Sequence, residues 1–136
     1  VKVIEMLPQV ETSLRVGFST AKSSLFLADG TTNSVCFDYE GNFMSPTIEQ
    51  PRRSKKVCRM PFSFKVVGLV LNLVEGSPNA DTISIFFDGV RQAKPQPIPE
   101  HLRGKALYPT LTFKNMTLAV NLGVGGLQMR KLSFAC

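Results

Sequence analysis

Short runs of β-favouring residues, separated by turn residues, recur along the chain, and almost no stretch has the spacing of an amphipathic helix. Apolar and polar residues alternate in residues 82–87 and 117–122, which predicts that one face of each strand lies on a core and the other in solvent. The apolar positions expected in that core include Ile83, Ile85, Leu118 and Val120. Seven runs are expected to form strands: residues 1–7, 14–18, 34–37, 66–73, 82–87, 107–113 and 117–122.

Two features of this pattern predict how the strands are arranged. Residues 66–71 are apolar at both alternating sets of positions, so this strand is expected to be covered on both sides and to be the central strand of its sheet. Asp88-Gly89 directly follows an apolar run, which predicts a two-residue hairpin turn with positive φ at both residues.

Prolines interrupt the pattern in residues 94–100. Pro95, Pro97 and Pro99 cannot donate hydrogen bonds to a sheet, so this segment is expected to leave the sheet in an extended form. Residues 100–104 are expected to form one helical turn at most. Many short strands with turns at this spacing predict an all-β fold, specifically an antiparallel β-sandwich.

The composition fits a single folded domain. Of the 136 residues, 43% are hydrophobic and 19% are charged, which is too apolar for a disordered chain. The longest apolar stretch, residues 66–71, is far shorter than the roughly 20 residues that a membrane-spanning helix needs. We therefore expect one domain over residues 1–136, with its own hydrophobic core and no membrane span.

The net charge of +6 comes from 16 Lys and Arg residues against 10 Asp and Glu residues. All of the excess lies in residues 52–65, which hold six cations and no carboxylate, so the charges of the rest of the chain cancel. We therefore predict a neutral body with one basic loop. The residues of this loop that are expected to bind a partner are Arg52, Arg53, Lys55, Lys56 and Arg59.

Two kinds of target are compatible with the basic loop. Its cations could neutralise the phosphates of a nucleic acid or another polyanion, and such binding would weaken steeply with added salt. However, residues 52–60 contain no aromatic residue on which a base could stack. An acidic protein surface attracts cations equally well. A solvated or protein-facing loop is therefore the first interpretation, and polyanion binding through residues 52–65 is the alternative.

Candidate catalytic chemistry is sparse. His101 is the only histidine, and it is expected to be an exposed loop residue. Cys58, between Lys56 and Arg59, is either a thiol with a lowered pKa or a small packed side chain, and we expect the second. Residues 123–126 are expected to form a turn, not a phosphate loop, and no residue cluster has metal-ligand spacing. We expect no enzyme activity, catalytic residue, metal or cofactor.

The cysteines suggest a compartment. Cys36, Cys58 and Cys136 form an odd, widely spaced set without a CxxC pair. Disulfide scaffolds have far denser cysteines. A reduced, intracellular setting is therefore expected, in the cytoplasm or the nucleus.

Six segments, in order along the chain, resemble motifs of the SPRY domain family. Residues 14–19 (LRVGFS) resemble its RVGWS strand, with Phe18 in place of Trp. Residues 64–73 (FKVVGLVLNL) resemble GDVIGCLLDL, with Lys65 in place of Asp. The other four are residues 34–41 (SVCFDYEG), similar to SYGYDG; 83–89 (ISIFFDG), similar to ISFTKNG; 108–109, a matching YP; and 120–123 (VNLG), similar to FNFG.

The resemblance implies two curved antiparallel sheets and a non-catalytic protein–protein interaction or scaffold module, part of a larger assembly. A protein partner is expected to dock on loops that the sandwich holds rigidly: residues 29–32, 42–59 and 94–103. Family members have strands before the one matched by residues 1–7, so the chain is expected to be a fragment of a longer protein.

Two further expectations concern ligands. An aromatic residue on a loop or an outer sheet face is a candidate hot spot for a partner, and Phe26, Phe43 and Phe86 are the residues to inspect. Carbohydrate binding is a third possible function, because sandwiches also host lectins. The sequence has no clear cluster of aromatic, carboxylate and amide residues that would support it.

Overall fold

The computed structural model describes residues 1–7, 9–49, 54–59 and 65–122. These residues form strands and one short 3-10 turn, and no α-helix occurs in these ranges. The strands are β1 (Lys2–Met6), β2 (Ser13–Thr20), β3 (Ser34–Asp38), β4 (Asn42–Met44), β5 (Ser54–Lys56), β6 (Val67–Asn72), β7 (Thr82–Phe87), β8 (Val90–Arg91), β9 (Gln96–Pro97), β10 (Leu107–Lys114) and β11 (Met116–Ala119). The all-β prediction is confirmed.

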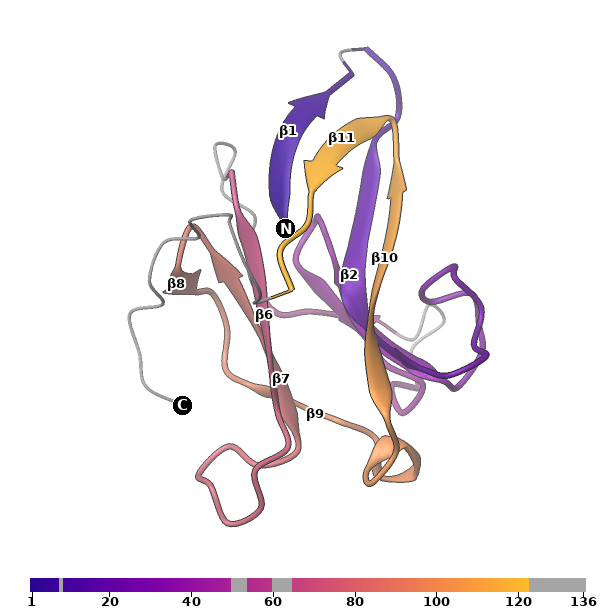
Figure 1. Ribbon diagram of the computed structural model, residues 1–136, viewed down its shortest axis with the longest axis vertical. Helices are drawn as coiled ribbons and strands as arrows, with labels where there is room; N and C mark the ends of the chain where they lie inside the picture. The colour runs from indigo at the N-terminus through magenta and orange to yellow at the C-terminus, as the bar shows by residue number, and fades with distance from the viewer. Residues whose placement is uncertain (8, 50–53, 60–64, 123–136) are drawn as a thin grey trace.

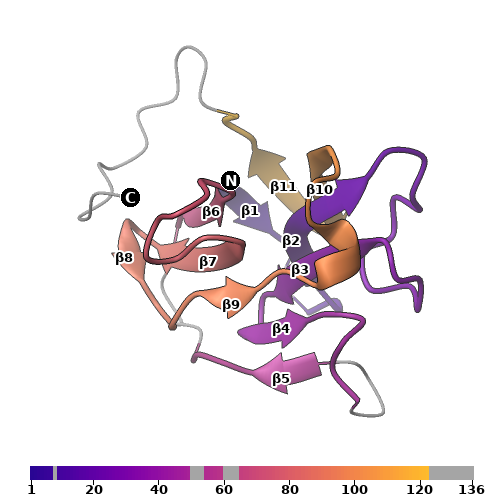
Figure 2. The ribbon, with the colours of Figure 1, turned by 90° about the horizontal axis from the view of Figure 1, so that it is seen from below.

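Five strands form one antiparallel sheet in the order β10-β2-β3-β4-β5. Its register places Leu111, Val16, Phe37 and Phe43 in one row across four neighbouring strands. Because alternate residues of a strand point to opposite faces, this row lies on the inner face of the sheet. Figure 2 shows β3, β4 and β5 continuing the sheet away from β2.

A second antiparallel sheet has the order β6-β7-β8, and β9 pairs with the other part of β7. β1 pairs with β11, and an isolated bridge between Lys2 and Val66 connects β1 to the start of β6. Figure 1 shows β6 and β7 on one side of the core and β2 and β10 on the other. Buried residues of both sheets form one apolar cluster: Leu14, Val16, Val35, Phe37, Phe43, Val67, Ile83, Ile85, Phe87, Ile98 and Leu102. The arrangement is consistent with a β-sandwich.

The central strand of the second sheet is β7, so the prediction for residues 66–71 is wrong. β7 has neighbours on both sides, whereas β6 is paired along its length with β7 alone. Only Val67 of β6 is buried, while residues 83–87 of β7 are all buried. The expected polar face of β7 is wrong as well, because Ser84 and Phe86 are buried on the side that the alternation assigns to solvent.

The proline-rich segment stays on the sheet, contrary to the prediction. Gln96 and Pro97 form β9 and lie opposite Ile83 and Thr82. This is an edge position, and an edge strand tolerates proline because only one of its sides is paired. The short turn after it, Glu100–Leu102, is a single 3-10 turn, as expected.

The other local predictions have mixed outcomes. The hairpin at Asp88 and Gly89 is confirmed, with φ of 48° and 85°. Leu118 packs against the core, but Val120 is 42% exposed and is not a core residue. The strands β4 and β5 were not expected. None of the described residues belongs to a helix that is long and apolar enough to cross a membrane.

Candidate interaction surface

A loop between β2 and β3, residues 21–33, covers part of the outer face of the five-stranded sheet, and Leu27 anchors it. The Leu27 side chain is fully buried. Its backbone N–H donates to Thr112 Oγ1 (2.9 Å), and its carbonyl accepts from Arg15 Nη1 (2.7 Å). Thr112 Oγ1 also donates to the carbonyl of Leu25 (2.9 Å). These bonds fix the backbone of the loop against β2 and β10.

The anchored loop presents two large apolar side chains to solvent. Leu25 is 78% exposed and Phe26 is 70% exposed. Of the three phenylalanines considered as hot spots, Phe26 is therefore the exposed one, because Phe43 lies in the core and Phe86 is fully buried. Large apolar side chains held on a fixed backbone are typical anchors of protein interfaces.

The outer face beneath the loop is tightly packed at Gly17. A Cβ atom on Gly17 would lie 2.1 Å from the carbonyl oxygen of Val35 and 2.5 Å from the Cβ of Cys36. Cys36 lies opposite Gly17 in the register and is almost completely buried. Its burial raises the pKa of the thiol to about 12. Cys36 is therefore a neutral packing residue on the outer side of the sheet.

A polar groove of about 720 Å³, called the outer groove below, lies on the same face. Arg15 of β2 and Asp38 of β3 line it, together with Asn42 and Met44 of β4. Residues 28–31 of the anchored loop also line it. The groove therefore combines strand residues, whose positions the sheet fixes, with loop residues, whose position Leu27 fixes.

The carboxylates of the outer groove already hold local hydrogen bonds. Asp38 accepts from the backbone N–H groups of Glu40 and Asn42 and from the side-chain amide of Asn42. Asp29 accepts from the backbone N–H of Thr31 (2.9 Å), and this bond lowers the pKa of Asp29. These bonds fix the turns that carry the carboxylates, so the groove is preorganised.

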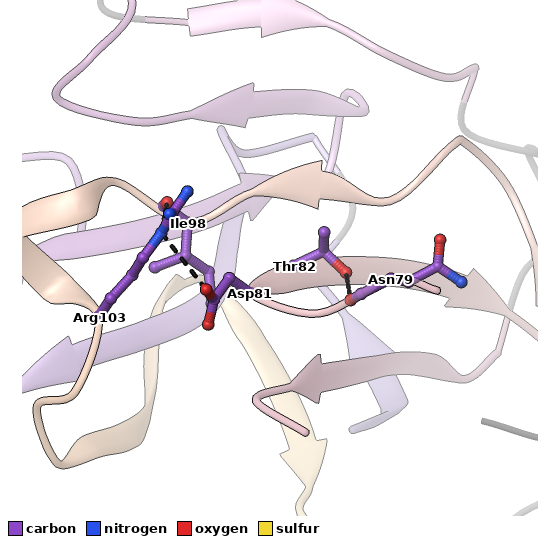
Figure 3. A network of polar contacts seen from close by, with 5 residues as sticks. All are labelled: Asn79, Asp81, Thr82, Ile98 and Arg103. Carbon is purple, nitrogen blue, oxygen red and sulfur yellow. Dashed lines mark hydrogen bonds and ion pairs between the residues drawn. The ribbon is translucent and has the colours of Figure 1, made fainter. Parts of the chain in front are cut away.

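Two of the three loops expected to hold a partner are connected directly. His101, in residues 94–103, has Nε2 at 2.6 Å from the carbonyl oxygen of Thr32. Arg103 forms an ion pair with Asp81 (3.6 Å) and donates to the carbonyl of Ile98 (Figure 3). Asn42, Met44 and Ser54 of the third loop line the outer groove together with residues 29–31 of the first, whereas no residue of 94–103 lines it.

The basic residues are placed differently from the prediction. Arg52 and Arg53 lie outside the described residues. Lys55 and Lys56 belong to strand β5, so this part of the chain is an edge strand and not a loop. Arg59 follows β5 and is exposed.

The two lysines of β5 point to opposite faces of the sheet, since neighbouring residues of a strand alternate. Lys55 lies opposite Phe43, on the inner side, and Lys56 lies opposite Asn42, on the side of the outer groove. Lys56 Nζ also donates to the carbonyl of Glu40. These two cations therefore do not form one continuous basic surface.

The remaining candidates for reactive chemistry are packed or exposed single residues. Burial raises the pKa of Cys58, although the charge of Lys56 acts in the opposite direction. The Cys58 thiol faces the carbonyl of Gly41 (3.8 Å). This favours the packed side chain over the reactive thiol. His101 is exposed, as expected, and the described ranges contain no group of His, Cys, Asp and Glu that could hold a metal ion.

Sequence reasoning missed the anchor Leu27 and with it the outer groove. The signal was the apolar triplet Leu25, Phe26 and Leu27 inside an otherwise polar loop. A scan against models of known protein families finds no match for this chain, and a search of curated proteins finds no significant relative.

Proposed function

We propose that the chain is a non-catalytic protein-interaction module with a β-sandwich of the SPRY type. The observation that carries the proposal is the outer groove, a preorganised cavity lined by parts of two of the three loops expected to hold a partner. The remaining loop, residues 94–103, contacts the first through His101 and Thr32. A surface that is already ordered binds at a low entropic cost, because few side chains and loops must be immobilised.

The positions of the family-like motifs support the SPRY type. LRVGFS runs along β2, GLVLN along β6 and ISIFFDG along β7 and its hairpin. The YP pair lies on β10, next to β2. These four motifs therefore lie on strands of two facing antiparallel sheets, which is the arrangement that the resemblance implies, whereas residues 120–122 of the VNLG segment follow the last strand.

The chemistry of the outer groove suggests a polar peptide segment as the partner. Four residues with carboxylates, Glu11, Asp29, Asp38 and Glu40, line it together with Arg15. A partner segment with amide and cationic donors complements this lining. The exposed Leu25 and Phe26 belong to the same loop as groove residues 28–31 and offer an additional apolar contact.

An arginine placed inside the groove tests the proposal. Met44 lines the groove and is half buried, so Met44→Arg fills the cavity with a long cation. Val90→Arg, at an exposed site on the other sheet, introduces the same residue as a matched control. Proteins captured from a cell extract by each variant are compared with those captured by the unsubstituted chain. We expect Met44→Arg to lose the partner and Val90→Arg to keep it.

Charge reversal separates this function from polyanion binding. Lys55→Glu with Lys56→Glu removes two of the cations that would contact phosphates. We expect RNA and DNA retention at low salt to be low in both chains and unchanged by the reversal. Strong retention that the reversal abolishes, with no partner lost in Met44→Arg, would favour the nucleic-acid alternative and contradict the proposal.

A further inference from the structure

Strand β6 is paired along its full length on one edge only. β7 pairs with β6 over its full length. On its other side, β6 meets the start of β1, where Lys2 lies opposite Val66 and where Val1 and Val67 bond to each other. No other strand of the described ranges pairs with this side. Past Val67, β6 therefore has an open edge.

Leu69 and Leu71 carry the backbone groups of this open edge. Asp88 donates its N–H to the carbonyl of Val66 (2.9 Å), so Val66 and every second residue after it direct their backbone groups toward β7. Leu69 and Leu71 direct their N–H and C=O groups the other way. Backbone groups in such a row bind an extended segment, which adds to the sheet as a strand.

An apolar groove of about 500 Å³ runs beside the open edge, and both sheets contribute to it. Leu69 and Leu71 of β6 line it together with Phe18 of β2 and Leu111 of β10. All four side chains are only half buried. Among the described residues that line the groove, none has a charged side chain. The groove therefore suits apolar side chains that enter from an added strand.

The chain itself supplies a segment of suitable length and composition. Leu122, the last described residue, lines the same groove, and fourteen residues follow it. Fourteen extended residues span roughly 45 Å, whereas the whole of β6 spans about 20 Å. Residues 127–134 have the composition of a strand, and their apolar members are Leu127, Met129, Leu132 and Phe134.

We propose that residues 127–134 add to the open edge of β6 as an extra strand and place apolar side chains in the groove. The added strand supplies partners for the backbone groups of Leu69 and Leu71. It also gives β6 a second neighbour in the sheet. This proposal does not rest on the outer groove or on the partner proposed to bind there.

Amide hydrogen exchange in the 136-residue chain tests the proposal. We expect the amides of Leu69 and Leu71 to be protected, at a level independent of protein concentration. In the variant with Leu127, Met129, Leu132 and Phe134 all changed to Ser, exchange at both amides should become at least about tenfold faster. The amides of β7 should stay protected, which shows that the variant is folded. In the matched control, Gln128→Ser with Ser133→Gln, the rates should not change.

Each other occupant of the groove gives a distinct result that overturns the proposal. Unprotected amides in the unsubstituted chain would show that the groove is empty. Protection that grows with protein concentration, together with a dimer mass, would assign the groove to a second copy. Protection that appears only after a partner protein is added would assign it to that partner. Should the serine variant not fold, nuclear Overhauser contacts between residues 127–134 and Leu69 or Leu71 in the unsubstituted chain decide, and their absence refutes the proposal.

Discussion

The two faces of the five-stranded sheet are both covered, but by different means. On the inner face, the row that contains Val16, Phe37 and Phe43 belongs to the apolar cluster shared with the second sheet. On the outer face, a single loop anchored by Leu27 bonds to Arg15 of β2 and Thr112 of β10, and Cys36 lines the outer groove. The inner contacts join whole strands, whereas the outer contacts hold one loop in place. The inner face therefore determines whether the chain folds, and the outer face determines the shape of the outer groove.

The largest expected effect is on the inner face, at Phe37. Its side chain is 1% exposed, and its ring centroid lies 5.1 Å from that of Phe43. Phe37→Ala removes these contacts and leaves a cavity between rigid strands, so we expect a loss of about 3–5 kcal/mol in the free energy of unfolding. Urea denaturation measures this loss. The control is Phe26→Ala on the exposed loop, with an expected change within about 0.5 kcal/mol.

Leu27, which anchors the loop on the outer face, should contribute less to the free energy of unfolding than Phe37 does. Leu27→Ala removes a fully buried side chain, but the loop around it can relax into part of the space, so a loss of about 2–3 kcal/mol is expected. Leu25→Ala, two positions away at a highly exposed site, is the matched control and should leave the stability nearly unchanged. Equal losses in these two variants, measured by the same denaturation, would contradict the anchoring role of Leu27.

The inner face was largely predictable from the sequence, and the outer face was not. The core positions that face this inner side from the second sheet, such as Ile83 and Ile85, recur with the period of a strand, which is local information. Burial of Leu27 requires a loop to fold back onto β10, 85 residues away in the sequence. The strand β5 was missed because it has three residues, two of them lysines, and exists only through its pairing with β4.

The pattern of apolar and polar residues also could not predict the order of the strands in the sheet. Both β6 and β7 are rich in apolar residues, and nothing in either run shows which of them has two neighbours. In the described ranges β7 has neighbours on both edges, whereas β6 past Val67 has only β7, and the further inference rests on this open edge.

A smaller loss in the free energy of unfolding is expected from a substitution at Gly17, where the outer face is most tightly packed. Gly17→Ala places a methyl group against the backbone oxygen of Val35 and against Cys36, and β2 and β3 must separate to accept it. Overpacking of this kind costs about 1–3 kcal/mol. We expect about 2 kcal/mol by thermal or urea denaturation. If the variant lost no stability, β2 and β3 would separate at this point without cost, and the outer face would not be tightly packed there.

The smallest expected effect concerns the Cys36 thiol on the outer face, whose contribution to the free energy of unfolding changes with pH. Because burial raises its pKa from the ordinary value of 9.0 to about 12, the folded chain keeps this proton at a pH where the unfolded chain releases it. The contribution to stability is therefore complete below pH 9 and is lost as the pH rises toward 12. We expect the stability difference between the unsubstituted chain and Cys36→Ala to shrink over this range.

Thiol labelling at pH 8 gives the matching kinetic test of this buried residue. With Cys58 and Cys136 changed to Ser, Cys36 should react about a hundredfold or more slowly than a free thiol, because it is almost completely buried and its pKa is raised. In the reverse variant, which keeps Cys58 alone, the half-buried thiol should react faster than Cys36 but still more slowly than a free thiol, since its pKa is also raised. Leu27→Ala should speed the labelling of Cys36 and leave that of Cys58 unchanged. Equal acceleration at both cysteines would mean that Leu27 stabilises the whole fold, and that the two faces of the sheet are not held independently.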